Sequence, residues 1–212
     1  MNRMLWGCAI ALIWAVCGHS QVIEFETNGL KYQTLTKSGV TIMFATLPQR
    51  LHDYAIIQVA VSNGSKSPYI IRPEDFTYER LDGSVLRASP ARIVVSVLEQ
   101  RGSAGDVVKL VTSYENSIYG NQHLKSTNGY EQRRQSVLAM GSVKLKAAAA
   151  ASALALVQTK LMPGESTDGA VFFPTEGKVL GFGHLVVRTS TDIFNFTTDC
   201  GTPPHCSIRT AR

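Results

Sequence analysis

Two cysteines near the end of the chain, Cys200 and Cys206, form its tightest cluster of reactive side chains. They bracket Gly-Thr-Pro-Pro-His, a segment whose glycine and prolines can turn the chain back on itself. A zinc site would use both thiolates and His205, but three ligands within seven residues are cramped, and no second Cys/His pair completes the set. We therefore favour a disulfide between Cys200 and Cys206, which an oxidising compartment would maintain.

The five histidines form no recognisable catalytic or metal-binding pair. H-x-x-x-H, H-E-x-x-H, G-x-S-x-G and P-loop motifs are all absent from the sequence. His184 has the best functional prospect, because it lies near aromatic residues in a strand-like segment, although a hydrogen-bonded structural histidine is the ordinary case. Glu74 and Asp75 follow Pro73 in a turn, where solvated or capping carboxylates are usual. We predict no catalytic residues, no cofactor and no metal; the alternative is a hydrolytic enzyme whose site is assembled only by the fold.

The first twenty residues have the pattern of an export signal. Arg3 supplies a short positive region, and Met4 to Val16 is an apolar run of the length found in signal peptides. This run is shorter than the ~20 residues that cross a bilayer as a helix. Small residues precede Gln21, so we predict that residues 1–20 are a signal peptide cleaved before Gln21.

Cys17 offers an alternative route of processing, as the lipidated N-terminus of a bacterial-type lipoprotein. Val16 stands where such a processing site has a small residue, and soluble export is therefore favoured over a lipid anchor. Both routes place the mature chain outside the cytoplasm, in the periplasm or the medium. That location agrees with a disulfide in the tail.

The overall composition is that of a folded protein with a modest positive charge. Hydrophobic residues make up 44% and charged residues 17% of the chain, which excludes intrinsic disorder. The net charge is +5, and the basic residues are dispersed, being densest at Arg133-Arg134 and at Lys144 and Lys146. Dispersed positive charge more often aids solubility than binds nucleic acid, so no nucleic-acid partner is predicted.

The stretch from Tyr54 to Ala88 organises the predicted fold. Ile57, Val59 and Val61 alternate with their neighbours, and this period of two is typical of a strand. Asp82-Gly83 is typical of a hairpin turn between two further strands, since glycine accepts a positive φ angle. Short strands at this spacing indicate an antiparallel sandwich or barrel.

Further strand-like runs lie around this stretch. Pro48 is predicted to end one of them, and Pro73 to place the short strand at residues 69–72 on a sheet edge, because proline has no N–H for the ladder. The flanking runs are residues 30–36, 40–46, 169–173, 182–187 and 193–196.

Between residues 89 and 161 the apolar period changes to that of helices. Ser89 is predicted to cap a first helix, with Pro90 in its first position. Ser103 and Asp106 have the spacing of a capping box and are predicted to begin a second helix.

A single long helix is predicted from about Tyr130 to Lys160. Its wholly apolar part is too short to span a bilayer, so no transmembrane span is predicted in the mature chain. We expect its apolar seam to pack on the sheets or on the preceding helices, with self-association through residues 130–160 as the alternative. The seam consists of Met140, Val143, Ala147, Ala150, Leu154, Val157 and Leu161.

The predicted fold class is thus mainly β with an α insertion. An immunoglobulin-like antiparallel β-sandwich is expected over residues 21–199, interrupted by a helical block at residues 89–161. Strands occur on both sides of the block, and for that reason it is an insertion and not a separate domain. Residues 200–212 form a C-terminal tail with the predicted disulfide.

Several short motifs carry a resemblance to a known group. In order they are Val59-x-Val61-x-Asn63-x-Ser65, Pro73-x-Asp75-Phe76, Asp82-Gly83, Leu161-x-Pro163-Gly164-Glu165 and Gly169-x-Val171-x-Phe173. This order resembles telokin-like, immunoglobulin-fold extracellular modules of bacterial lipoproteins and exported proteins. The resemblance covers residues 30–46, 59–88 and 161–196, while the helical block departs from the compact module.

The resemblance implies a binding or assembly role and brings no catalytic residues with it. We therefore predict an exported, non-catalytic module of the cell envelope, whose partner is an envelope protein or surface component.

Overall fold

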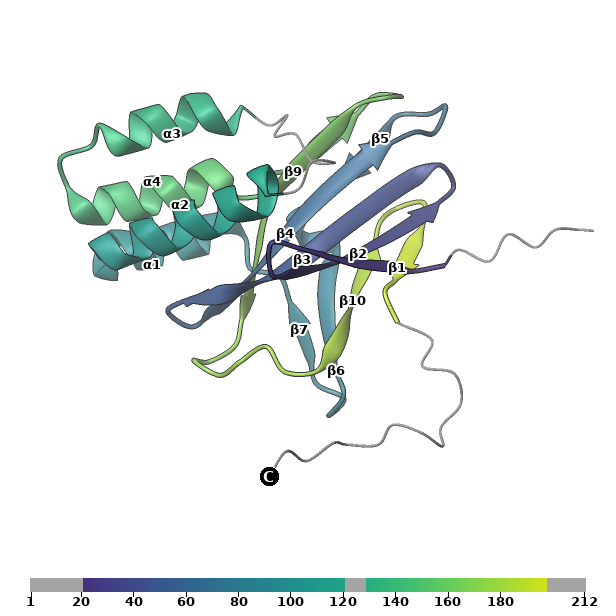
Figure 1. The fold of residues 1–212 in the computed structure, drawn as a ribbon, viewed down its shortest axis with the longest axis horizontal. Coiled ribbons are helices and arrows are strands. Elements are labelled where there is room, and N and C mark those ends of the chain that lie inside the picture. Colours follow the sequence, from purple (N-terminus) through teal and green to yellow (C-terminus); the bar gives the residue numbers. More distant parts are fainter. Residues whose placement is uncertain (1–20, 121–128, 198–212) are drawn as a thin grey trace, which may run out of the picture.

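The computed structural model of this chain describes residues 21–120 and 129–197. These residues form three layers (Figure 1). Four α-helices lie on one face of a five-stranded sheet, and a four-stranded sheet packs against its other face. Mainly antiparallel β structure with helices between the strands is what the sequence predicts. The predicted signal peptide, Cys17, Cys200 and Cys206 lie outside the described residues.

The strands follow one another along the chain in two groups, before and after the helices. They are β1 (Ile23–Thr27), β2 (Leu30–Lys37), β3 (Val40–Leu51), β4 (Tyr54–Asn63), β5 (Tyr69–Ile71), β6 (Phe76–Arg80), β7 (Val85–Arg87), β8 (Thr159–Leu161), β9 (Ser166–Pro174), β10 (Gly183–Arg188) and β11 (Ile193–Asn195). The five-stranded sheet has the order β1-β2-β3-β4-β9, and the four-stranded sheet the order β11-β10-β6-β7. All these neighbours are antiparallel, and β5 pairs separately with β8.

The helical layer is built around α4. The helices are α1 (Ala91–Arg101), α2 (Ala104–Tyr119), α3 (Tyr130–Leu138) and α4 (Val143–Leu154), and a 3-10 turn covers Pro73–Asp75. Helix α4 contacts each of the other three. Its alanines leave little side chain between the backbones, which lets three helices approach it closely.

Strand β4 separates two hydrophobic cores because both of its faces are buried. Tyr54 and Ile56 face the core under the helices, whereas Ile57, Val59 and Val61 face the core between the sheets. Such a strand, buried on both sides, explains the nearly continuous apolar run in the sequence. Aromatic pairs close the second core, with Phe44 edge-on to Phe196 and Tyr78 edge-on to Phe173.

The prediction of one helix from Tyr130 to Lys160 is wrong. Helix α3 ends at Leu138, and α4 begins after Gly141, with the Ser142 hydroxyl accepting a hydrogen bond from the Leu145 amide. After Leu154 the chain becomes extended, and residues 159–161 pair with β5 as strand β8. The helical block therefore ends before residue 161. The alanine-rich segment strongly favours a helix, and the prediction therefore overlooked Gly141 and the Ser142 cap, which separate α3 from α4.

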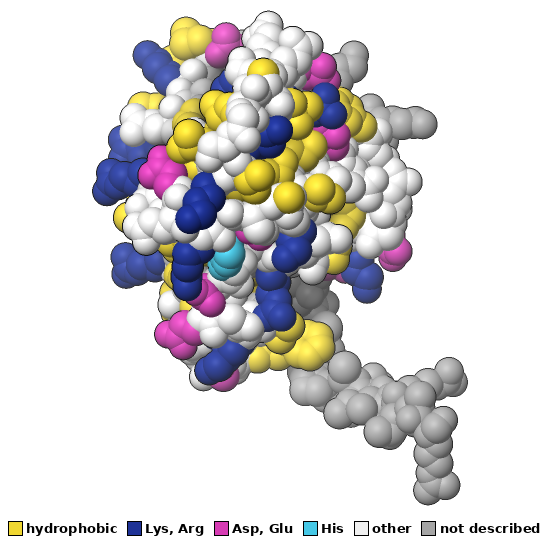
Figure 2. Space-filling model, turned by 90° about the vertical axis from the view of Figure 1, so that its left-hand side faces the viewer, with side chains coloured by type: hydrophobic (Ala, Val, Ile, Leu, Met, Phe, Trp, Pro, Cys, Tyr) yellow, Lys and Arg dark blue, Asp and Glu magenta, His cyan; other side chains and the backbone are white. Residues whose placement is uncertain are grey.

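The predicted seam of that helix is correct only in part. Ala147, Ala150 and Leu154 are buried in the core under the helices. Met140 and Val143 are 38% and 46% exposed, and Val157, beyond the helix, is 59% exposed. Figure 2 shows hydrophobic side chains at the surface on this side of the molecule, with Lys and Arg side chains among them.

Two predicted element ends are also wrong. Pro48 does not end β3, which continues to Leu51, because an irregularity in its pairing with β4 between Thr46 and Arg50 accommodates the proline. Ser89 does not cap α1: it forms a bridge to Phe172 in β9, and Pro90 occupies the N-cap position. The hairpin at Asp82-Gly83 is confirmed, with a φ angle of +83° at Gly83.

The capping box that begins α2 is confirmed. The Ser103 hydroxyl accepts a hydrogen bond from the Asp106 amide, and Asp106 Oδ2 accepts bonds from the Ser103 amide and hydroxyl, at 2.9 and 2.7 Å. Burial raises the pKa of Asp106, but the bonds from Ser103 and the neighbouring His52 outweigh burial, so the pKa lies below its ordinary 3.8.

This lowered pKa predicts an acid-sensitive contribution to stability. A carboxylate with a lowered folded-state pKa stabilises the fold above its ordinary pKa, and the contribution is lost as pH falls through the folded-state value. We expect Asp106→Ala to cost about 1 kcal/mol at neutral pH, as loss of a cap does, and clearly less in acid. Urea denaturation at neutral pH and below 3.8 measures both. The exposed Glu99→Ala on α1 is the control, and an equal cost of Asp106→Ala at both pH values would contradict the account.

Candidate binding groove

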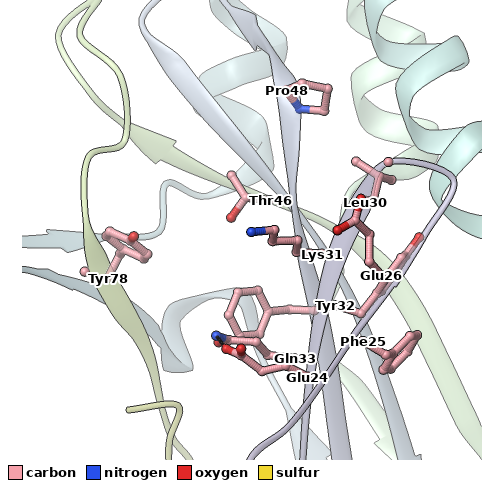
Figure 3. A pocket seen from close by; sticks show the side chains of 13 residues that line it. Glu24, Phe25, Glu26, Leu30, Lys31, Tyr32, Gln33, Thr46, Pro48 and Tyr78 are labelled. Atoms are coloured by element: carbon pink, nitrogen blue, oxygen red, sulfur yellow. Dashed lines mark hydrogen bonds between the residues drawn. The ribbon is translucent and has the colours of Figure 1, made fainter. Parts of the chain in front are cut away.

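A hollow of about 630 Å³ opens where the inner face of β1, β2 and β3 meets one end of the four-stranded sheet (Figure 3). We call it the inter-sheet groove. Along β2 the inner-facing residues change from the buried Leu35 to the half-buried Gln33 and the exposed Lys31. The second sheet thus covers one end of β2 and leaves the other end open. The groove is lined by Glu24, Phe25, Glu26, Gly29, Leu30, Lys31, Tyr32, Gln33, Phe44, Thr46, Pro48, Tyr78 and Gly183.

Strand pairing places four polar side chains of β1 and β2 on the same face. Glu24 lies opposite Gln33 and Glu26 opposite Lys31, and the Gln33 amide donates a hydrogen bond to the Glu24 carboxylate. Because successive side chains alternate between faces, all four point to the side of the groove. Phe25 is the residue between the two glutamates, and it faces the other way.

The Phe25 side chain anchors this edge of the sheet by packing on the side of the helices. Its ring stacks on Tyr32 with the centroids 5.2 Å apart, and the Tyr32 hydroxyl donates a 2.7 Å hydrogen bond to the Ser117 carbonyl in α2. In Figure 3 both rings lie on the other side of β1 and β2 from Tyr78. The helical layer therefore holds β1 and β2 in place while their polar face stays free.

The opposite wall of the groove is formed by Tyr78 and Gly183. Tyr78 faces across from β6, and its hydroxyl donates a 3.0 Å hydrogen bond to the Gly181 carbonyl. Burial raises the pKa of Tyr78, so the hydroxyl is a neutral donor at neutral pH. Gly183 has no side chain beside this ring, and a Cβ there would lie 2.8 Å from the ring and 2.3 Å from the Glu79 carbonyl oxygen.

The groove is chemically suited to binding. It offers two carboxylates and one ammonium group on a strand face, with Phe44 beside them on β3 and Tyr78 across from them on the other sheet. Carboxylates attract cationic groups, and aromatic faces attract them as well. These residues were not predicted as a site from the sequence, although the alternation of Glu24 and Glu26 with apolar neighbours is typical of a strand.

A second hollow lies between the helices and β9, at the residues that follow α4. Its volume is about 800 Å³, and Arg133, Asp168 and Glu165 are among its lining residues. Two of these have structural partners: Tyr114 donates a 2.5 Å hydrogen bond to Asp168, and the Arg133 guanidinium donates a 2.7 Å bond to the Ala153 carbonyl near the end of α4. These bonds tie α2 to β9 and α3 to α4.

His184, the histidine singled out from the sequence, lies on the outer face of the four-stranded sheet. Its Nε2 is 3.5 Å from Glu79 Oε2, and the other oxygen of Glu79 accepts a 2.8 Å hydrogen bond from Arg188. That bond lowers the pKa of Glu79. Neither His184 nor Glu79 lines either of the two hollows. The three side chains form a polar network between β6 and β10.

His52, Asp106 and Ser103 have the composition of a catalytic triad but a different order. His52 Nε2 and Ser103 Oγ both approach the same Asp106 oxygen, at 3.2 and 2.7 Å. In a triad the imidazole stands between the hydroxyl and the carboxylate, so that it can take the hydroxyl proton. Here the carboxylate stands in the middle and caps a helix. No sequence pattern predicts the contact between His52 and Asp106, because His52 lies in the turn between β3 and β4 and Asp106 on α2.

Asp75, the other carboxylate considered from the sequence, is a capping residue as predicted. Its Oδ2 accepts a 2.9 Å hydrogen bond from the Arg72 amide at the start of the 3-10 turn. The described residues contain no cluster of three or more His, Cys, Asp or Glu side chains that could hold a metal ion. In the same residues, no helix has the length and apolar character needed to cross a membrane.

Comparisons with known proteins do not place this chain in a family. No protein-family model matches it, and no curated protein matches it significantly. One solved structure with some similarity is the crystal structure of the yjhA protein from Bacillus subtilis. It aligns with 9% identity over 80% of this chain and 79% of that chain, with a TM-score of 0.31. At this score the similarity carries no argument about fold or function.

Proposed function

We propose that this protein is an exported, non-catalytic module of the cell envelope, with immunoglobulin-like architecture, that binds an extended segment of a partner protein along β1. The observation that carries the proposal is the inter-sheet groove, with Glu24 and Glu26 aligned on the outermost strand of the five-stranded sheet. Its volume of about 630 Å³ lies within the usual range for binding sites, about 300–1,000 Å³.

The edge position of β1 supports an extended polypeptide as the ligand. Among the described residues β1 pairs only with β2, so the backbone groups on its outer edge are not used by either sheet. An extended segment can add to such an edge through main-chain hydrogen bonds, and its alternate side chains then provide specificity.

The charges beside this edge favour a particular sequence of partner. A strand added to β1 would place every second side chain next to Glu24 or Glu26, on the groove side of the sheet. Opposite charges on neighbouring strands stabilise pairing, and like charges destabilise it. We therefore expect lysine or arginine at alternate positions of the bound segment. The export pattern of residues 1–20 supports an envelope location for this partner.

Reversing the two charges tests the proposal. We expect Glu24→Lys/Glu26→Lys to lower recovery of the partner at least tenfold, in crosslinking pull-downs from intact envelopes, because two attractive cross-strand pairs become repulsive. The control is Glu99→Lys/Glu176→Lys, which makes the same change in net charge at two other exposed sites. Equal recovery with both double variants, or loss with the control alone, would contradict binding at β1.

A further inference from the structure

The turn between α3 and α4 carries an apolar surface that the fold does not use. Residues 138–146, which we call the α3–α4 corner, expose four large apolar side chains. These are Leu138, Met140, Val143 and Leu145, which are 44, 38, 46 and 53% exposed. Figure 2 shows hydrophobic side chains gathered over the helical layer, with Lys and Arg side chains among them.

The position of these side chains on α4 explains why the monomer leaves them uncovered. The face of α4 that packs on the other helices and the sheet consists of small residues, including Ala147, Ala150 and Ala151, all buried. Val143 and Leu145 stand in the first turn, and both are exposed. The helix would form with polar residues there, because Ser142 supplies its cap. The apolar residues of the corner therefore point to contact with something outside the monomer.

The charges of the corner distinguish between two kinds of contact. Lys144 and Lys146 lie between and beside the apolar residues, and residues 138–146 contain no aspartate or glutamate. A second copy docking through the same surface about a twofold axis would bring these lysines against their own counterparts, which is unfavourable. An anionic surface would satisfy both lysines and accept the apolar side chains. This contrast favours a lipid surface over the self-association considered from the sequence.

We propose that the α3–α4 corner docks on the surface of a bilayer that contains anionic phospholipids. Leu138, Met140, Val143 and Leu145 enter the boundary between headgroups and acyl chains, the depth at which proteins bound to a membrane surface bury apolar side chains. Lys144 and Lys146 stay at the level of the phosphates. The net charge of +5 favours the same approach. This surface is separate from the inter-sheet groove and does not depend on the function proposed for it.

Vesicle partitioning tests this proposal with the full chain. Binding is measured to two kinds of vesicle, one of pure phosphatidylcholine and one in which about one third is phosphatidylglycerol. The readout is the binding to the anionic vesicles divided by the binding to the neutral ones, which depends on charge. Comparing variants that differ only at named positions cancels any contribution from residues 1–20. We expect Lys144→Glu/Lys146→Glu to lower this ratio at least tenfold, since one lysine near an anionic surface contributes roughly fivefold. Val143→Ser/Leu145→Ser should lower binding to both kinds of vesicle.

Matched controls decide between the possible outcomes. Lys66→Glu/Lys178→Glu makes the same change in net charge at two exposed lysines elsewhere, and Leu81→Ser/Phe182→Ser removes two apolar side chains that are 81 and 85% exposed. Effects confined to the corner variants, with circular dichroism unchanged, support the proposal. Equal effects of the controls, or no effect of the corner variants, overturn it. A change in solution mass of the corner variants, with unchanged vesicle binding, would assign the surface to a second copy and overturn it as well.

Discussion

Ala150→Glu is expected to lower the free energy of unfolding by several kcal/mol, a large share of the about 5–15 kcal/mol of a typical domain. Ala150 is 2% exposed and belongs to the core between the helices and the five-stranded sheet. A glutamate there would bury an unpaired carboxylate and require more space than the packed helices leave. Because the burial occurs within one chain, the loss should appear as unfolding and not as dissociation of an oligomer.

Thermal denaturation combined with light scattering measures both aspects of this prediction. Ser152→Glu is the matched control, because Ser152 lies on the same helix and is exposed. We expect the control to keep the melting temperature of the wild type and Ala150→Glu to lower it strongly. A folded Ala150→Glu protein with an unchanged melting temperature and a lower mass would contradict burial within the monomer and favour an oligomer contact.

Gly169→Ala is expected to have the second largest effect, because β9 and the chain leaving α4 touch at this residue. A Cβ on Gly169 would lie 2.5 Å from the Leu156 Cα and 2.6 Å from its backbone nitrogen. The Leu156 amide donates a 2.9 Å hydrogen bond to the Ala170 carbonyl, which fixes the two segments side by side. Because the obstacle is backbone, a side-chain rotation cannot relieve it. We expect a loss of more than about 2 kcal/mol, at the upper side of overpacking effects.

Gly141→Ala provides the control for this second prediction. It is the same chemical change, but a Cβ on Gly141 would meet nothing within 4 Å. We expect the control to change the free energy of unfolding by no more than about 0.5 kcal/mol, as surface substitutions do. Urea denaturation of the two variants compares them directly, and equal stability would show that the two segments separate without cost.

The strands near the centre of the fold could be predicted from the sequence. Their apolar residues recur at every second position, and this period marks the buried face of a strand. Residues 40–46 and 169–173 are examples, and both lie in the strands that flank β4. The limits of the long helix were not predictable. The alanines of α4 favour a helix in any surroundings, whereas the end at Leu154 depends on the pairing of β8 with β5 and of Leu156 with β9.

The inter-sheet groove also could not be predicted from the sequence, because its walls come from strands that are far apart in the chain. The groove exists because β1 and β2 extend beyond the part of their sheet that the four-stranded sheet covers. The strands of that second sheet lie far along the chain, so Glu24 and Tyr78 come to line one hollow. A short strand with alternating glutamates indicates one solvated face. Nothing local distinguishes a solvated face from one that borders a cavity. The contact between His52 and Asp106 is likewise a product of the packing of a hairpin on a helix.

Photocrosslinking from inside the groove tests directly whether an extended segment of a partner binds along β1. A photoreactive residue in place of Gln33, which lies on the groove side opposite Glu24, should form a covalent bond to one partner protein in intact envelopes. Mass spectrometry should locate the bond in a segment with basic residues at alternate positions. The same group in place of the exposed Lys160 on β8 should not capture that protein. Capture of the same protein from position 160 but not from position 33 would contradict binding along β1.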